Sequence, residues 1–153
     1  MFNLENLKIL FVEDEENIRT NIKDAISEEF LSFDTACDGV EGLKKFKELK
    51  PDIVITDISM PNLDGLTMTD EIRKISSSVP VIILSAFSEK EKLFQAIDSS
   101  VNKYIVKPID IDELLEAISD IVNKNVNHQE IKLSQGYSFN NTKKELFLDG
   151  NFV

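Results

Sequence analysis

The chain of 153 residues has few features that would link it to an oxidising compartment or to a membrane. Its one cysteine, Cys37, cannot form a disulfide within the chain, which is consistent with a reducing compartment. No apolar run is long enough to span a bilayer, and residues 1–6 lack the basic and apolar regions of a signal peptide. We therefore expect a cytoplasmic protein without membrane contact.

Basic residues are scarce as well. Lys and Arg number 17 against 28 Asp and Glu, which gives a formal net charge of −11 and a pI of about 4.5. Nucleic acids and anionic membranes attract proteins of the opposite charge. The composition thus argues against direct binding of either by these residues.

Short apolar runs alternate with segments of helical periodicity over the first 124 residues. We expect strands at 7–12, 32–37, 52–57, 81–85 and 103–107, and helices at 15–28, 38–50, 64–75, 89–99 and 110–122. Such alternation predicts an α/β fold, a doubly wound parallel sheet of five strands with helices on both faces. The turn after the first strand has no Gly-rich phosphate loop, which argues against a nicotinamide site and favours the strand order 2-1-3-4-5.

This strand order brings polar residues from four strand ends to one edge of the sheet. Glu13 and Asp14 follow the first strand, Asp57 ends the third, Ser85 ends the fourth and Lys107 ends the fifth. Three carboxylates in one crevice repel one another unless a cation is present, and hard oxygen ligands suit Mg²⁺. Because a lysine and a hydroxyl could hold phosphoryl oxygens, we expect phosphoryl transfer with Asp57 as the nucleophile.

The motifs resemble those of the response-regulator receiver domains of two-component signalling. The resemblance covers about residues 5 to 124. The matching residues are Glu13-Asp14, Asp57, Met60-Pro61 with Asp64-Gly65, Ser85-Ala86, and Tyr104 with Lys107-Pro108.

The resemblance implies a role for each residue of the acidic crevice. Asp57 would accept a phosphoryl group from a sensor histidine kinase. Asp14, Asp57 and the backbone carbonyl of Ser59 would bind Mg²⁺ directly, and Glu13 would act through water. Lys107 would pair with Asp57 and then with the phosphoryl group, and the Lys107–Pro108 peptide would be cis.

A second implication concerns signalling. Ser85 and Tyr104 resemble the switch pair of the family, in which the hydroxyl moves to the phosphoryl oxygen and the aromatic ring swings inward. The surface of the fourth helix, fifth strand and fifth helix would carry the output. Such a receiver catalyses its own phosphorylation and dephosphorylation, but it is a switch and not a turnover enzyme.

Several residues depart from the family pattern. Ser100-Val101 stands where Gly-Ala is usual, so the turn before the fifth strand is expected to differ. Asn102-Lys103 replaces an acidic pair, and Asp112 stands where a basic residue is typical. These changes disturb the usual charge network for dimerisation, so we expect a homodimer that is weak or depends on phosphorylation.

Residues 125–153 differ from the receiver residues 1–124 in composition and in hydrophobic pattern. Residues 125–129 are polar and predict a linker, and residues 130–153 contain short alternating strands at 131–133, 137–139 and 145–148. The segment resembles the opening antiparallel sheet of a winged-helix transcriptional effector. Promoter DNA would then be bound only through parts of that effector that lie outside these residues.

Two other functions remain open at this point. The first is a receiver whose output is a protein partner, with the β tail as an interaction element. The second is a dehalogenase-like phosphohydrolase with an aspartyl nucleophile. Such enzymes need a second acid two residues after the nucleophile, and here that residue is Ser59.

Overall fold

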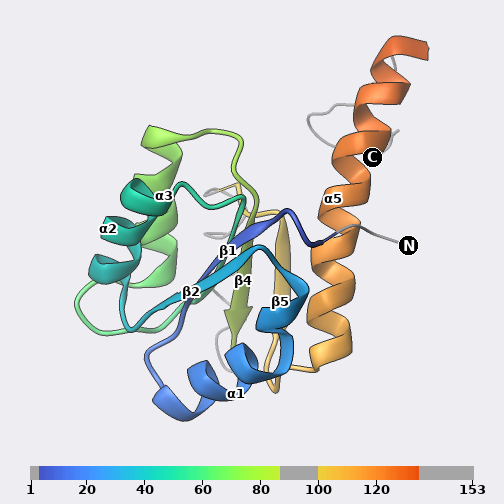
Figure 1. The fold of residues 1–153 in the computed structure, drawn as a ribbon. Coiled ribbons are helices and arrows are strands. Elements are labelled where there is room, and N and C mark those ends of the chain that lie inside the picture. The colour runs from blue at the N-terminus through green and yellow to red at the C-terminus, as the bar shows by residue number, and fades with distance from the viewer. Residues whose placement is uncertain (1–3, 87–99, 135–153) are drawn as a thin grey trace. The chain divides into compact units, whose positions relative to one another are not determined.

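A sheet of five parallel strands forms the centre of the fold. The structure, a computed structural model, describes residues 4–86 and 100–134, with side chains through residue 123. The strands lie in the order β2-β1-β3-β4-β5, which confirms the predicted fold (Figure 1). Their bounds are β1 (Lys8–Val12), β2 (Ser32–Ala36), β3 (Ile53–Asp57), β4 (Val81–Ser85) and β5 (Lys103–Val106).

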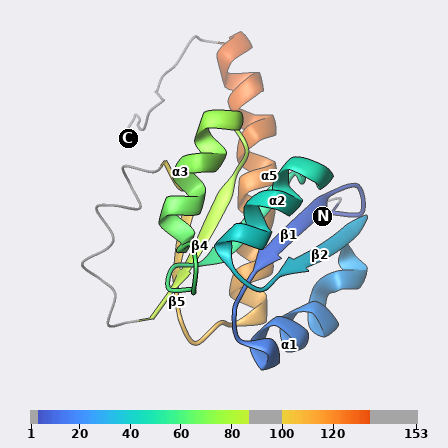
Figure 2. The same cartoon turned by 90° about the vertical axis from the view of Figure 1, so that its left-hand side faces the viewer.

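Helices cover both faces of this sheet. Helices α2 (Gly39–Leu49) and α3 (Gly65–Ile75) lie side by side on one face, and α1 (Glu16–Ile26) lies on the other (Figures 1 and 2). A 3₁₀ turn (Ser27–Glu29) follows α1. The helix predicted at 89–99 lies outside the described residues.

Aspartates begin α2 and α3. The Asp38 carboxylate accepts a hydrogen bond from the Glu41 amide at 2.8 Å, and Asp64 accepts one from the Thr67 amide at 2.7 Å. Each bond satisfies an amide that has no partner within the helix.

The central strands are apolar because both of their faces are covered. All five residues of β3 and all five of β4 are buried. Leu10, Val54 and Ile83 have no exposed surface. Burying each such side chain stabilises the fold by about 1.5–3 kcal/mol, which makes the sheet a rigid support for whatever lies at its ends.

The fifth helix differs from the sequence prediction. The chain divides into two units, residues 3–117 and 118–153, and α5 (Ile111–Ser134) belongs to both. Residues 123–134 are helical, so α5 extends beyond the helix predicted at 110–122, and the strand predicted at 131–133 is wrong. The linker at 125–129 stays a prediction. No Gly or Pro interrupts residues 111–134, so nothing in this stretch forces the helix to end. The strands predicted at 137–139 and 145–148 lie outside the described residues.

The turn before β5 contains one residue with an unusual backbone conformation. Ser100 has a φ of 61°, a left-handed conformation that favours glycine. Its carbonyl accepts a hydrogen bond from Arg73 Nη2 at 2.8 Å, and Arg73 Nη1 donates to the Val79 carbonyl at 2.7 Å. The Asn102 side chain accepts a bond from the Val81 amide at 2.9 Å. Arg73 and Asn102 thus connect the end of α3 and the start of β4 to this turn.

Candidate functional site

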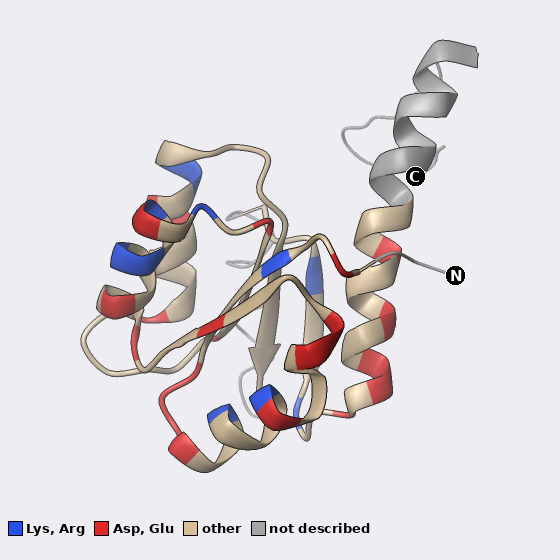
Figure 3. Cartoon of the chain, viewed as in Figure 1, with Lys and Arg blue, Asp and Glu red and all other residues tan. Residues whose placement is uncertain are grey.

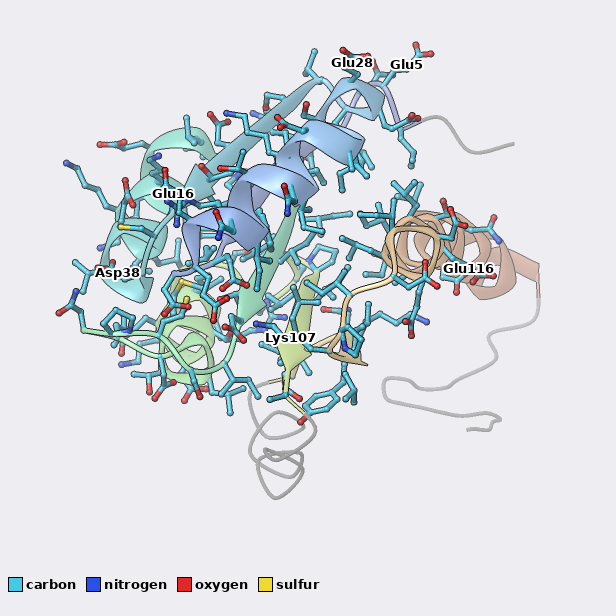
Figure 4. The ribbon with its side chains drawn as sticks, turned by 90° about the horizontal axis from the view of Figure 1, so that it is seen from below. Glu5, Glu16, Glu28, Asp38, Lys107 and Glu116 are labelled. Carbon is cyan, nitrogen blue, oxygen red and sulfur yellow. The ribbon has the colours of Figure 1, made fainter. Side chains whose placement is uncertain are left out.

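Four strand ends meet at one edge of the sheet. Val12 pairs with Thr56 across β1 and β3, so Glu13 and Asp57 follow on neighbouring strands. On the other side, the Lys107 amide donates to the Ser85 carbonyl at 2.7 Å. Seen from below, Lys107 lies in the middle of this edge (Figure 4). The structure therefore brings together the strand-end residues that the sequence singled out.

Three carboxylates are crowded at this edge. Carboxylate oxygens of Glu13, Asp14 and Asp57 lie within 4.8 Å of one another. Glu13 is fully buried and Asp57 is 6% exposed, whereas Asp14 is open to solvent. Lys107 Nζ lies 3.1 Å from Asp57 Oδ2 and 3.4 Å from Glu13 Oε1. One ammonium thus faces two buried carboxylates.

The pKa values reflect this imbalance. Burial raises the pKa of the Asp57 carboxyl, and Lys107 opposes that rise. Burial and then the charge of Asp57 raise the pKa of Glu13 from 4.5 to about 7. Burial acts to lower the pKa of Lys107, but the attraction of Asp57 and Glu13 outweighs it and the pKa is raised. The site holds more negative charge than Lys107 compensates.

The donor set fits a small, hard cation. Three carboxylates that can approach a common point supply oxygen ligands, and one of them is open to solvent, as suits Mg²⁺, which keeps several waters. A dication at this point would relieve the repulsion that raises the pKa of Glu13. Ser59 lies two residues after Asp57, in the loop at the same strand end, and its role as a carbonyl ligand stays a prediction.

The loop after β3 is fixed by backbone contacts around Asp57. The Ile58 amide donates to Asp57 Oδ1 at 2.9 Å, and the Gly65 amide donates to the Ile58 carbonyl at 2.8 Å. A Cβ atom on Gly65 would lie 2.0 Å from the Asp57 carbonyl oxygen. Any side chain at Gly65 would therefore displace the loop that follows Asp57.

The proposed switch residues are in direct contact. The hydroxyl oxygens of Ser85 and Tyr104 lie 2.8 Å apart, within hydrogen-bonding distance. Ser85 is fully buried at the end of β4, and Tyr104 is half-buried on β5. The sequence predicted that both belong to the site, but only the structure shows that they share a hydrogen bond. The Lys107–Pro108 peptide is cis, as the resemblance implied.

Sequence reasoning missed one contact of the site. Arg19, at the end of the first turn of α1, donates from Nη1 to the backbone carbonyl of Glu13 at 2.7 Å. Its spacing of six residues from Glu13 is unremarkable, and an arginine at the polar end of a helix usually faces solvent. The one local signal is the helix start at Glu16, because it places Arg19 within a single turn of the end of β1.

Comparison with known proteins shows what kind of domain carries this site. Residues 9–119 match the family model described as the response regulator receiver domain. The chain is 34% identical to the chemotaxis protein CheY of Halobacterium salinarum over 115 residues, which are 75% of this chain and 96% of that protein. It is 32% identical to the transcriptional regulatory protein KdpE of Staphylococcus aureus over 126 residues, which are 82% of this chain but only 54% of KdpE.

A solved structure agrees with the sequence matches. The N-terminal domain of the protein WS1339 from Wolinella succinogenes superposes with a TM-score of 0.73 at 38% identity, covering 80% of this chain and 98% of that one. In the part of our chain that the structure describes, no helix has the length and apolar character needed to cross a membrane. The matched family, the strand order and the acidic edge agree, and the chain belongs to the response regulator receiver family of two-component systems.

Proposed function

We propose that the chain is a phosphorylation switch that takes a phosphoryl group from a sensor histidine kinase onto Asp57. The observation that supports this most strongly is the environment of Asp57, a nearly buried carboxylate that contacts Lys107 and lies among further acidic oxygens. Attack by an Asp57 oxygen on phosphorus forms the O–P bond while the P–N bond of phosphohistidine breaks. The electron pair of that bond stays with the departing imidazole.

The neighbouring charges support this chemistry. Glu13, Asp14 and Asp57 would hold Mg²⁺, which supplies positive charge to the phosphoryl oxygens when bound. Lys107 contacts both buried carboxylates and is within reach of a group attached to Asp57. Because phosphoryl transfer depends mostly on orientation and charge neutralisation, this set is sufficient without a separate acid or base.

The output of the phosphorylation would pass through Ser85 and Tyr104. A phosphoryl oxygen on Asp57 would compete for the Ser85 hydroxyl, which lies 2.8 Å from the Tyr104 hydroxyl. Loss of that contact would change which arrangement of β5 is favoured, a shift between two populations. The signal would end by hydrolysis at the same site: water attacks phosphorus, the bond between phosphorus and the Asp57 oxygen breaks, and inorganic phosphate leaves with the carboxylate restored. The protein would thus act as a switch and not as a turnover enzyme.

Two kinds of downstream output have support. The similarity to KdpE, of which the chain spans 54%, favours a regulator that acts on transcription through a DNA-binding domain. The similarity to CheY over 96% of its length favours a receiver that acts on a protein partner. We favour the first because residues 136–140 and 142–150 resemble the opening sheet of a winged-helix effector. Whether the gene encodes a DNA-binding domain after Val153 distinguishes the two.

The phosphorylation itself can be tested with a small phosphodonor such as acetyl phosphate and Mg²⁺. We expect intact-mass spectrometry to show one added phosphoryl group on the wild-type chain and none on Asp57→Asn. Asp24→Asn, at an exposed position of α1, is the matched control and should be phosphorylated normally. Full phosphorylation of Asp57→Asn would contradict the assignment.

A further inference from the structure

The backbone between β1 and α1 carries two of the three acidic residues of the site. Figure 3 shows acidic residues concentrated in this loop and at the start of α1. Asp14 is exposed, so packing does not hold its side chain in place. A metal site needs its ligands in fixed positions, and the structure must therefore restrain the backbone of Asp14 in some other way.

Arg19 supplies that restraint. Its Nη1 donates to the Glu13 carbonyl at 2.7 Å, and its own amide donates to the Glu15 carbonyl at 2.9 Å. The Glu13 carbonyl and the Asp14 nitrogen belong to one planar peptide group. Holding the carbonyl oxygen therefore fixes the plane from which the Asp14 side chain leaves the backbone.

The other polar atoms of Glu13 are already engaged. Its amide donates to the Ala36 carbonyl at 3.0 Å, its Oε2 accepts from the Glu15 amide at 3.1 Å, and its Oε1 faces Lys107. The carbonyl bond to Arg19 completes this set. Glu13 and the following peptide are thus fixed by groups from β2, from α1 and its N-cap, and from Lys107, which directly follows β5.

We propose that Arg19 is a positioning residue for the cation site, one that holds Asp14 ready to bind Mg²⁺. This inference rests on the proposed function, because it takes Mg²⁺ as the ligand. As a charge alone, a guanidinium beside the site repels a dication, so its removal would tighten Mg²⁺ binding. As a positioning group, its removal weakens binding. The two roles predict changes of opposite sign.

The test is calorimetric titration of Mg²⁺ into the metal-free full chain without any phosphodonor. We expect Arg19→Gln to raise the Kd roughly tenfold, in the range seen when groups that orient metal ligands are removed. Arg19→Lys keeps the charge and can still donate a hydrogen bond. Its affinity for Mg²⁺ should therefore fall less than that of Arg19→Gln. Lys23→Gln, an equal loss of charge from an exposed position one turn later on α1, should bind as tightly as the wild type or slightly tighter.

Circular dichroism at the titration temperature ensures that each variant is compared in its folded form. An Arg19→Gln Kd equal to or below that of the wild type would overturn the positioning role while leaving the proposed function intact. Absence of Mg²⁺ binding by the wild-type chain would overturn both. These two failures are therefore distinguishable in the same experiment.

Discussion

Replacement of Glu13 by Gln should make the metal-free protein more stable at alkaline pH. Glu13 is fully buried, and burial together with the charge of Asp57 raises its pKa from 4.5 to about 7. A carboxyl whose pKa is higher in the folded state contributes stability that is fully present below pH 4.5. That contribution is lost as the pH rises to about 7. The difference corresponds to about 3 kcal/mol, and it already includes the attraction of Lys107.

The Gln side chain carries no such charge, but it has a fixed cost of its own. Only one of its two polar groups is an acceptor, so it cannot accept from both Lys107 and the Glu15 amide as Glu13 does. Loss of one acceptor costs about 1 kcal/mol at every pH. We therefore expect Glu13→Gln to be about 2 kcal/mol more stable than the wild type near pH 8, and slightly less stable near pH 4.5.

Urea unfolding in the presence of a chelator measures this difference at the two pH values. The quantity that tests the reasoning is the change of about 3 kcal/mol in the stability difference between them, since the fixed cost cancels. Glu48→Gln, an equal loss of charge at an exposed position, is the matched control. A stability difference between Glu13→Gln and the wild type that stays constant with pH would refute the argument. Mg²⁺ should restore stability to the wild type more than to Glu13→Gln.

Three further predictions follow from the backbone around the sheet. Ser100→Gly should stabilise the fold by about 0.5–1 kcal/mol, measured by urea unfolding. Glycine relieves the strain of the left-handed conformation at a φ of 61°, and this gain exceeds the cost of the added freedom in the unfolded chain. A destabilised variant would contradict this. Arg73→Met should cost about 2 kcal/mol, because three backbone carbonyls lose the guanidinium as their donor. Lys74→Met, at an exposed position, should change the stability little, and equal effects of the two substitutions would contradict this role of Arg73. Gly65→Ala should slow phosphorylation by acetyl phosphate, measured by intact mass, because its Cβ would meet the Asp57 carbonyl; an unchanged rate would show that the loop can adapt.

The location of the site followed from the sequence because parallel strands all point the same way. Apolar β-branched runs identified the strands, and the carboxyl ends of such strands must meet at one edge. A carboxylate at the end of Ile53–Asp57 and a lysine at the end of the fifth strand were thereby brought together, although 50 residues separate them. The helix starts were equally local, because Asp38 and Asp64 cap amides only three residues away.

The prediction of where the last helix ends was wrong, because it relied on amino-acid composition alone. Asn-rich residues at 123–129 predicted that the last helix ends near residue 122, yet α5 continues through Ser134. Asparagine lowers helix stability by well under 1 kcal/mol, about 0.7 at most, so a run without Gly or Pro can remain helical. Composition alone could not decide between these outcomes.

Tertiary structure decided the properties that depend on distances between elements. The pKa of Glu13 rises because the fold buries it beside Asp57. The residues next to Glu13 in the sequence do not predict that burial. The bond from Arg19 to the Glu13 carbonyl and the contact between Ser85 and Tyr104 likewise exist only once α1, β4 and β5 are in place. Residue types and their order along the chain determined which groups reach the edge of the sheet. How those groups share charge and hydrogen bonds there was set by packing, because hydrogen bonds need a narrow range of distance and angle and Coulomb energies depend on how deeply the charges are buried.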